Sequence, residues 1–148
     1  MEILDLLTVD RIALSVRARD KRSLIAELAR LTSAHTPGIA ASAIEAALLA
    51  REQLGSTGLG AGFALPHARV EGLGRFVGQF VRLARPIDFD AIDGKPVDTV
   101  FLLLIPDDGT DYVSALAAVS RRFRDPELRT QLREAGTPAE VERILTQR

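Results

Sequence analysis

A histidine, an arginine and two hydroxyl residues lie close together in a glycine-rich part of this 148-residue chain. Arg51 precedes Ser56 and Thr57, and His67 follows them directly after a proline. A guanidinium offers a planar fork of donors to phosphate oxygens, hydroxyls add further donors, and a neutral imidazole is a nucleophile toward phosphorus. These residue types indicate a phosphoryl-binding site in which His67 is a covalent acceptor.

The same residues also have a purely structural interpretation. The glycines can form tight turns, the two hydroxyls can bond to the nearby backbone, and His67 can be a structural or merely exposed side chain. On spacing alone, both interpretations stay open. The second of the two histidines, His35, lies at the tail of a predicted helix, where an imidazole is ordinary, and we assign it no function.

The sequence lacks the motifs of other common binding and catalytic sites. The glycines do not complete a GxGxxG dinucleotide loop, and no Lys-Ser/Thr pair follows them as in a P-loop. The chain has no cysteine, no HExxH, no GxSxG and no histidine cluster, which argues against thiol catalysis, a nucleophile elbow and a zinc site. The aspartates within residues 88–98 do not match an EF-hand loop and are expected to solvate turns.

Two helices are expected to precede and support this site. The first spans residues 20–37, with Asp20 as its N-cap and an apolar stripe at helical spacing. The second begins at Ser42, which forms a capping-box pattern with Glu45. This second helix carries Arg51 in its last turn.

We expect the glycine-rich stretch to be irregular. Beyond it, the sequence predicts strands and then helices. Residues 75–84 alternate with β-type side chains, whereas residues 97–105 are almost continuously apolar, which is typical of a strand covered on both faces. Three helices follow, the first after the turn DDGTD, the second at Asp125-Pro126 and the third capped by Thr137. Helices first, strands in the middle and helices last indicate an α/β layered domain.

Composition favours a single compact domain over residues 1–148, because 47% of the residues are hydrophobic and 26% are charged. A net charge of -1 with mixed signs gives no broad footprint for nucleic acid. The start of the chain is interrupted by acidic residues and does not resemble a secretory signal, and the apolar run at residues 100–105 is too short to span a membrane. We therefore expect a cytoplasmic protein.

Longer motifs resemble a known family. Residues 51–60 read REQLGSTGLG and residues 64–67 read ALPH, which is similar to the signature of the enzyme IIA fructose/mannitol family of the bacterial phosphotransferase system. The resemblance continues through RPIDFDAIDGKPV at residues 85–97 and VFLLLIP at residues 100–106, and it covers essentially the whole chain. Within the family, the nitrogen-regulatory branch is the most similar.

This resemblance implies a fold and a function. The fold is an α/β single layered domain with a mixed, mostly parallel central sheet flanked by helices. His67 would take a phosphoryl group from HPr or its nitrogen-branch relative, while Arg51, Ser56 and Thr57 bind the phosphate. The group would then pass to an enzyme IIB domain and to sugar, or its presence would control regulated target proteins. No cofactor or metal is implied, and neither nucleic-acid binding nor direct membrane insertion is expected.

One position departs from the family pattern. Tyr112 stands where family members usually carry a second active-site histidine, and a phenol donates a hydrogen bond but is not cationic. Two functions therefore remain open, a phosphotransferase component with a phosphohistidine intermediate and a regulatory binding module with weakened or lost phosphorylation. In either case we expect Arg51, Ser56, Thr57, His67 and Tyr112 to surround one shallow, accessible depression.

Overall fold

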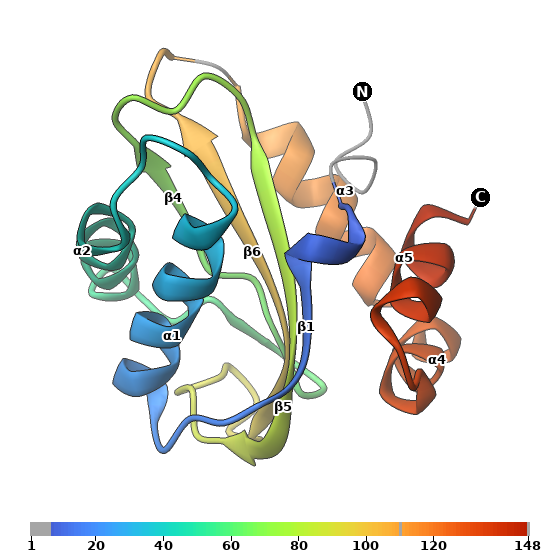
Figure 1. Cartoon of the computed structure of the whole chain (residues 1–148). Coiled ribbons are helices and arrows are strands. Elements are labelled where there is room, and N and C mark those ends of the chain that lie inside the picture. Colours follow the sequence, from blue (N-terminus) through green and yellow to red (C-terminus); the bar gives the residue numbers. More distant parts are fainter. Residues whose placement is uncertain (1–6, 110, 148) are drawn as a thin grey trace.

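The computed structural model describes residues 7–109 and 111–147, and it places a sheet between two layers of helices (Figure 1). In chain order the elements are the 3-10 helix η2 (Val9–Arg11), β1 (Ile12–Val16), α1 (Lys21–Ala34), α2 (Ala41–Glu52), β2 (Gly58–Gly60), β3 (Phe63–Ala64), β4 (His67–Val70), β5 (Val77–Ile87), β6 (Val97–Pro106), α3 (Val113–Phe123), α4 (Pro126–Glu134) and α5 (Pro138–Thr146).

The sheet is mixed, as predicted. Its strands follow the order β1-β5-β6-β3-β2, and β4 also pairs with β6. The pairings of β1 with β5, of β3 with β6 and of β4 with β6 are parallel, whereas β5 with β6 and β2 with β3 are antiparallel. With three of the five pairings parallel, the predicted mixed, mostly parallel sheet is confirmed.

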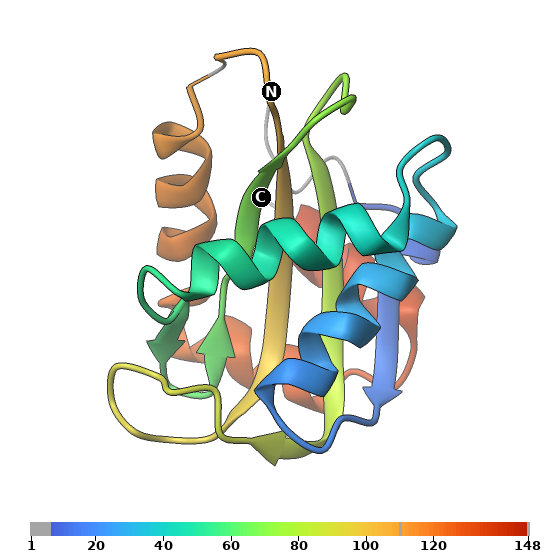
Figure 2. The same cartoon turned by 90° about the vertical axis from the view of Figure 1, so that its left-hand side faces the viewer.

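Strand β6 is covered on both faces, which confirms the interpretation of its continuous apolar run. Helices α1 and α2 lie across one face of the sheet and α3, α4 and α5 lie on the other (Figures 1 and 2). Leu102 and Leu104 belong to the core cluster on the side of α1 and α2, while Phe101 and Leu103 belong to the cluster on the other side. The core thus consists of two layers divided by the sheet.

Side-chain caps define several helix starts. The Asp20 carboxylate accepts the backbone N–H of Ser23 at 2.8 Å, and the Ser23 hydroxyl accepts the N–H of Asp20 at 3.1 Å, which forms a reciprocal capping box at α1. Asp125 caps α4, whose first residue is proline, and the Thr137 hydroxyl accepts the N–H of Glu140 at α5. These three starts were predicted from the sequence and are confirmed.

The predicted capping box at Ser42 is wrong. Helix α2 begins one residue earlier, at Ala41, so Ser42 lies inside the helix rather than at its N-cap. The N-cap residue is Ala40, which has no side-chain oxygen and makes no side-chain cap hydrogen bond. Tertiary packing of Ile44 and Leu48, both fully buried, replaces the cap as the support of this helix.

The stretch from residue 55 to residue 67 is more regular than predicted. It contains the short strands β2 and β3, and His67 is the first residue of β4 rather than the end of a loop. Glycine has a low strand propensity. These strands form here because β3 and β4 pair with β6, which supplies their backbone hydrogen bonds. Strand β1 was not predicted either, since Ile12 is its one fully buried residue and its alternation is weak.

Truncation of β6 on either face should destabilise the domain. We expect Leu102→Ala and Leu103→Ala each to lower the free energy of unfolding by about 2–5 kcal/mol, because each side chain is fully buried in a different core cluster. Denaturant unfolding of both variants provides the measurement. A cost below about 1 kcal/mol for either one would mean that its face of the strand is not packed as described.

Candidate functional site

His67 is held at the start of β4 by backbone pairing with β6. The carbonyl of Pro66 accepts the N–H of Leu103 at 2.9 Å, and His67 itself lies opposite Leu103 in the parallel pairing with β6. The imidazole is half-buried. Because β6 is the buried centre of the sheet, the position of the His67 backbone is fixed by the core rather than by a free loop.

The hydrogen bonds of His67 define its tautomer. The ring Nδ1 lies 2.8 Å from the carbonyl oxygen of Leu65, which can only accept, so Nδ1 carries the proton. The ring Nε2 lies 3.3 Å from Nε of Arg51, which can only donate, so Nε2 carries the lone pair. The neutral ring therefore presents Nε2 as a base or nucleophile on the side of Arg51.

The surroundings of His67 favour its neutral form. Burial lowers the pKa of the imidazole below its ordinary value of 6.5, and the positive charge of Arg51 lowers this pKa further. The hydrogen bond to Leu65 and the negative charge of Glu52 act in the opposite direction and do not outweigh burial. The neutral nucleophile is thus the main species near pH 7.

Arg51 reaches His67 from the last turn of α2. Its Nε donates to the imidazole, and its Nη1 donates to the carbonyl of Gly55 at 3.0 Å. A guanidinium has five N–H groups in a planar fork. Among the residues that the structure describes, the other three have no acceptor. They remain available to an anion that approaches Nε2.

The two hydroxyls predicted to bind phosphate have protein partners. The Ser56 hydroxyl donates to the carbonyl of Phe89 at 2.8 Å and accepts the N–H of Gly58 at 3.0 Å. Thr57 is 3% exposed, and both its hydroxyl and its N–H donate to the carboxylate of Glu52. These contacts hold the glycine-rich segment against its neighbours.

Glu52 links this segment to the first helix. Its carboxylate lies 2.8 Å from the ammonium group of Lys21, which also lies 4.7 Å from the centre of the Phe89 ring. Because Glu52 follows Arg51 in α2, this network fixes the end of the helix from which Arg51 extends. Glu52 belongs to the REQLGSTGLG motif, whereas Lys21 lies outside the motifs found in the sequence.

Tyr112 and Arg69 complete the site on the other side of His67. Tyr112 is the N-cap residue of α3, and its ring centre lies 6.4 Å from that of His67. The guanidinium carbon of Arg69 lies 4.8 Å above the Tyr112 ring, while Nη1 of Arg69 donates to the carbonyl of Pro106 at 2.8 Å. The structure therefore brings Arg51, His67 and Tyr112 together and adds a second cation.

Arg69 was missed because residues before β4 were expected to be irregular. Once a strand begins at His67, side chains two residues apart project from the same face, so Arg69 follows on the face of His67. The position of that strand depends on pairing with β6, which no local pattern reveals.

Within residues 7–109 and 111–147, no three His, Cys, Asp or Glu side chains gather closely enough to hold a metal ion. In the same part of the chain, no helix is both long enough and apolar enough to cross a bilayer. The donors around His67 are guanidinium, phenol and imidazole groups, which suit a phosphate anion rather than a cation.

Known proteins are similar to this chain in sequence and in fold. The family model described as "Phosphoenolpyruvate-dependent sugar phosphotransferase system, EIIA 2" matches residues 5–148. A nitrogen regulatory protein of Bradyrhizobium diazoefficiens is 38% identical over 146 residues, which cover 98% of this chain and 95% of the relative.

Two solved structures extend this likeness. The nitrogen regulatory protein IIA-Ntr from Neisseria meningitidis has a TM-score of 0.90 at 35% identity, covering 97% of this chain and 99% of that one. Enzyme IIA for mannitol from Escherichia coli, solved in complex with phosphorylated enzyme IIB, has a TM-score of 0.79 over 96% of this chain and 98% of that one. At 18% identity, the second likeness concerns the fold alone. From the family match and the full-length relative, it follows that the chain belongs to the EIIA type 2 family of the phosphoenolpyruvate-dependent sugar phosphotransferase system.

Proposed function

We propose that this chain is a phosphoryl carrier that accepts a phosphoryl group on Nε2 of His67 and acts through its phosphorylation state. The observation that carries the proposal is the tautomer of His67, with its proton held by Leu65 and its lone pair directed toward Arg51. Such a ring can attack phosphorus without first losing a proton. Family membership agrees with this chemistry.

The transfer step balances without a cofactor. As Nε2 of His67 forms a bond to phosphorus, the bond between phosphorus and the donor's histidine nitrogen breaks, and that nitrogen keeps the electron pair. The His67 ring becomes cationic because Nδ1 retains its proton. The Leu65 carbonyl, already 2.8 Å from Nδ1, stabilises this charge through a charge-assisted hydrogen bond.

Arg51 is suited to release Nε2 and then bind the incoming group. Its contact with Nε2 is 3.3 Å long, which is beyond the usual range of a strong N–H hydrogen bond. Exchange of this contact for charged bonds to phosphoryl oxygens is therefore favourable. For Ser56 and Thr57 we propose a supporting role, since their hydroxyls already hold the segment beside Arg51.

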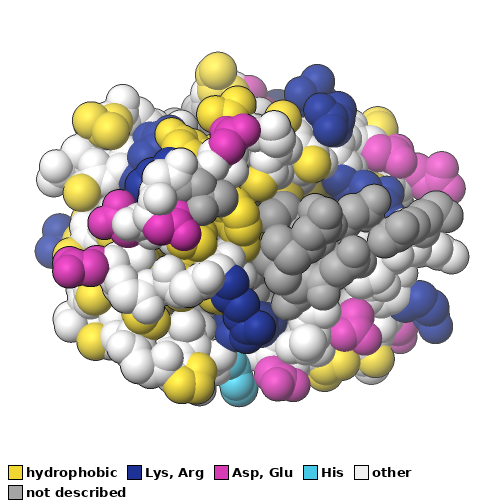
Figure 3. Space-filling view, turned by 90° about the horizontal axis from the view of Figure 1, so that it is seen from above, with side chains coloured by type: hydrophobic (Ala, Val, Ile, Leu, Met, Phe, Trp, Pro, Cys, Tyr) yellow, Lys and Arg dark blue, Asp and Glu magenta, His cyan; other side chains and the backbone are white. Residues whose placement is uncertain are grey.

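The partner in this proposal is a protein rather than a small molecule. Apolar side chains are exposed beside the site, including Leu54 at 84% just after α2 and Val113 at 64% next to Tyr112. On the face where β4 and β6 end, the coloured acidic, basic and apolar side chains are interspersed and form no broad basic patch of the kind that binds nucleic acid (Figure 3). The donor is a phosphohistidine protein of the HPr type or of the nitrogen branch, met in the cytoplasm.

The output proposed for the phosphorylated chain is regulation. The similar full-length relative is named a nitrogen regulatory protein, which favours contact with regulated targets over sugar transport. Onward transfer to an enzyme IIB remains the transport alternative, because such a complex is known for a protein of the same fold. A regulatory module with weakened phosphorylation is favoured by one observation, the phenol of Tyr112 beside His67.

His67 should titrate below its ordinary pKa. Burial and the Arg51 charge favour the neutral ring, so we expect a midpoint lower than 6.5 in the folded chain. The neutral ring then stabilises the fold above the pKa of the unfolded chain, and this contribution is lost as the pH falls through the lower, folded pKa. Long-range proton–nitrogen NMR reports both the midpoint and the proton on Nδ1.

The Arg51→Gln variant separates the two causes of this shift. Its His67 midpoint should rise above that of the wild type yet stay below that of the urea-unfolded chain, because burial is the larger cause. A wild-type midpoint at or above the unfolded value, or a proton on Nε2, would contradict the described site.

Replacement of His67 should abolish phosphorylation without unfolding the chain. A phosphoenolpyruvate-driven donor system should add one acid-labile phosphoryl group to the wild type and to His35→Ala, but none to His67→Ala. His35 is an exposed residue at the end of α1 and serves as the matched control. Intact mass measurement under non-acidic conditions gives the result, and circular dichroism checks the fold. Label on His67→Ala would rule out the carrier assignment.

Arg69 should supply part of the positive charge that a second histidine would provide. Loss of about 1.4 kcal/mol of transition-state stabilisation slows a reaction tenfold, so we expect Arg69→Gln to be phosphorylated about tenfold more slowly. Tyr112→His should be phosphorylated faster than the wild type, because it adds a cationic donor beside His67.

A double-mutant cycle tests whether the two cations replace each other. Tyr112→His should give a larger gain in the Arg69→Gln background than in the wild type. Time courses of acid-labile phosphorylation with one donor supply the four rates. Equal gains in both backgrounds would show that the two cations do not replace each other, and an unchanged rate for Arg69→Gln alone would show that Arg69 does not contribute charge to transfer.

A further inference from the structure

A cavity lies at the end of the sheet where the parallel strands β1 and β5 finish, far along the sheet from β4. It is formed by Arg17, Ala18, Arg19, Ser23, Glu27, Ala84 and Arg85, and its volume is about 730 Å³. The segment after β1 contributes one wall and the end of β5 another, at the lower end of the sheet in Figure 1. We propose that this cavity binds a small molecule that carries a diphosphate group.

The position of the cavity is one where open sheets bind ligands. Val16 of β1 pairs in parallel with Leu83 of β5, and the lining residues follow directly after each. Carboxyl ends of parallel strands commonly form ligand crevices in α/β folds. A volume of about 730 Å³ also falls in the range of small-molecule pockets, about 300–1,000 Å³.

Charge in the cavity is unbalanced. Arg17, Arg19 and Arg85 line it together, and within the described part of the chain none of their guanidinium groups donates a hydrogen bond or forms an ion pair. Two acidic groups lie nearby, and one of them, Asp20, interacts electrostatically with Arg19. Glu27 pairs with Arg30, and the Asp20 carboxylate accepts the N–H of Ser23.

The ligand class follows from these groups. A guanidinium fork matches the oxygens of a phosphate, and three of them match the two to four negative charges of a diphosphate. The start of α1 is closed by its Asp20 cap, so the guanidinium groups rather than the helix end are the donors. Ala18 and Ala84 leave room for an organic group against small apolar side chains.

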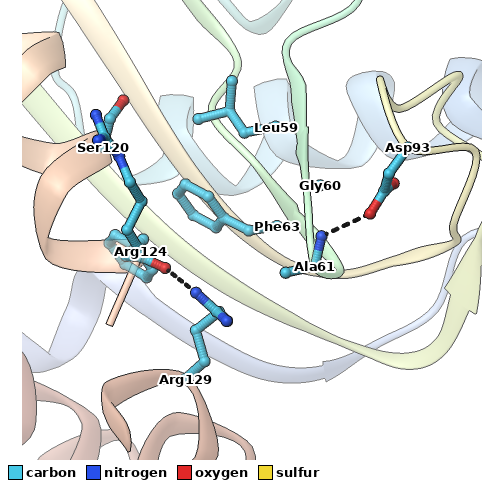
Figure 4. A pocket seen from close by; sticks show the side chains of 9 residues that line it. Leu59, Gly60, Ala61, Phe63, Asp93, Ser120, Arg124 and Arg129 are labelled. Atoms are coloured by element: carbon cyan, nitrogen blue, oxygen red, sulfur yellow. Dashed lines mark hydrogen bonds between the residues drawn. The ribbon is translucent and has the colours of Figure 1, made fainter. Parts of the chain in front are cut away.

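A second cavity has a more balanced set of charged groups and serves as a comparison. Arg124 and Arg129 line a space over Phe63, with Asp93 on the opposite side (Figure 4). There Arg129 donates to the carbonyl of Phe123 at 2.8 Å, and Asp93 accepts the N–H of Ala61 at 2.9 Å. With one of its two arginines engaged and an acidic side chain in its lining, that space has a smaller excess of free donors than the one at Arg17, Arg19 and Arg85.

Titration of the whole chain with sodium pyrophosphate tests the proposal. At low ionic strength, saturable shifts in proton–nitrogen NMR spectra should appear at residues 17–23 and 84–85 and be absent at His67. Arg17→Gln and Arg85→Gln should each weaken binding about tenfold, because each removes a charged donor. Arg22→Gln is the matched control, since Arg22 is exposed on α1 and outside the cavity lining.

Two further ligands, adenosine diphosphate and a glutamate-rich peptide, distinguish a small-molecule site from a protein-binding surface. Adenosine diphosphate binding at least as tightly as pyrophosphate would support an organic diphosphate as the ligand. The proposal is overturned if shifts spread equally over other arginines, if Arg22→Gln weakens binding as much as Arg85→Gln, or if a glutamate-rich peptide displaces pyrophosphate at lower concentration. The last result would assign the surface to an acidic protein. Circular dichroism checks that the Arg17→Gln, Arg85→Gln and Arg22→Gln variants are folded.

Discussion

The pairing of β6 on both of its edges is the constraint on which the candidate site depends. This strand is buried from both faces, so its register cannot shift without moving two core clusters at once. His67 lies opposite Leu103 of β6, on a strand at the edge of the sheet. Helices from the two faces can therefore reach it, α2 with Arg51 and α3 with Tyr112.

Local sequence patterns predicted those features that depend on neighbours along the chain. The N-caps of α1, α4 and α5, the buried strand β6 and the pair of Arg51 and His67 came from residue types at short spacing, whereas Tyr112 came from the family resemblance. The partners of Ser56 and Thr57 could not be predicted. Their hydroxyls bond to Phe89 and to a carboxylate whose orientation is fixed by Lys21, and these contacts exist only after folding.

The position of Arg69 also depends on contacts that exist only after folding. Its place beside Tyr112 requires β4 to start at His67, and that start is set by long-range pairing rather than by propensity, since the preceding segment is rich in glycine. Motif comparison directed attention to positions where the family carries histidine. Arg69, two residues after His67 on β4, falls outside such a motif even though its guanidinium lies over the Tyr112 ring.

The departure at Tyr112 weakens the site less than a count of histidines suggests, if Arg69 acts as proposed. Coulomb attraction falls only as the inverse of distance, so moving a charge from about 4 Å to about 8 Å halves the attraction to a phosphoryl group in the same medium. Where a second histidine would supply a charged hydrogen bond, a phenol can supply only a neutral one of roughly half the strength. Because Arg69 is held by Pro106 and by the Tyr112 ring, little ordering is needed before it acts. On this proposal, the Arg69 guanidinium over the Tyr112 ring retains part of what one imidazolium would supply.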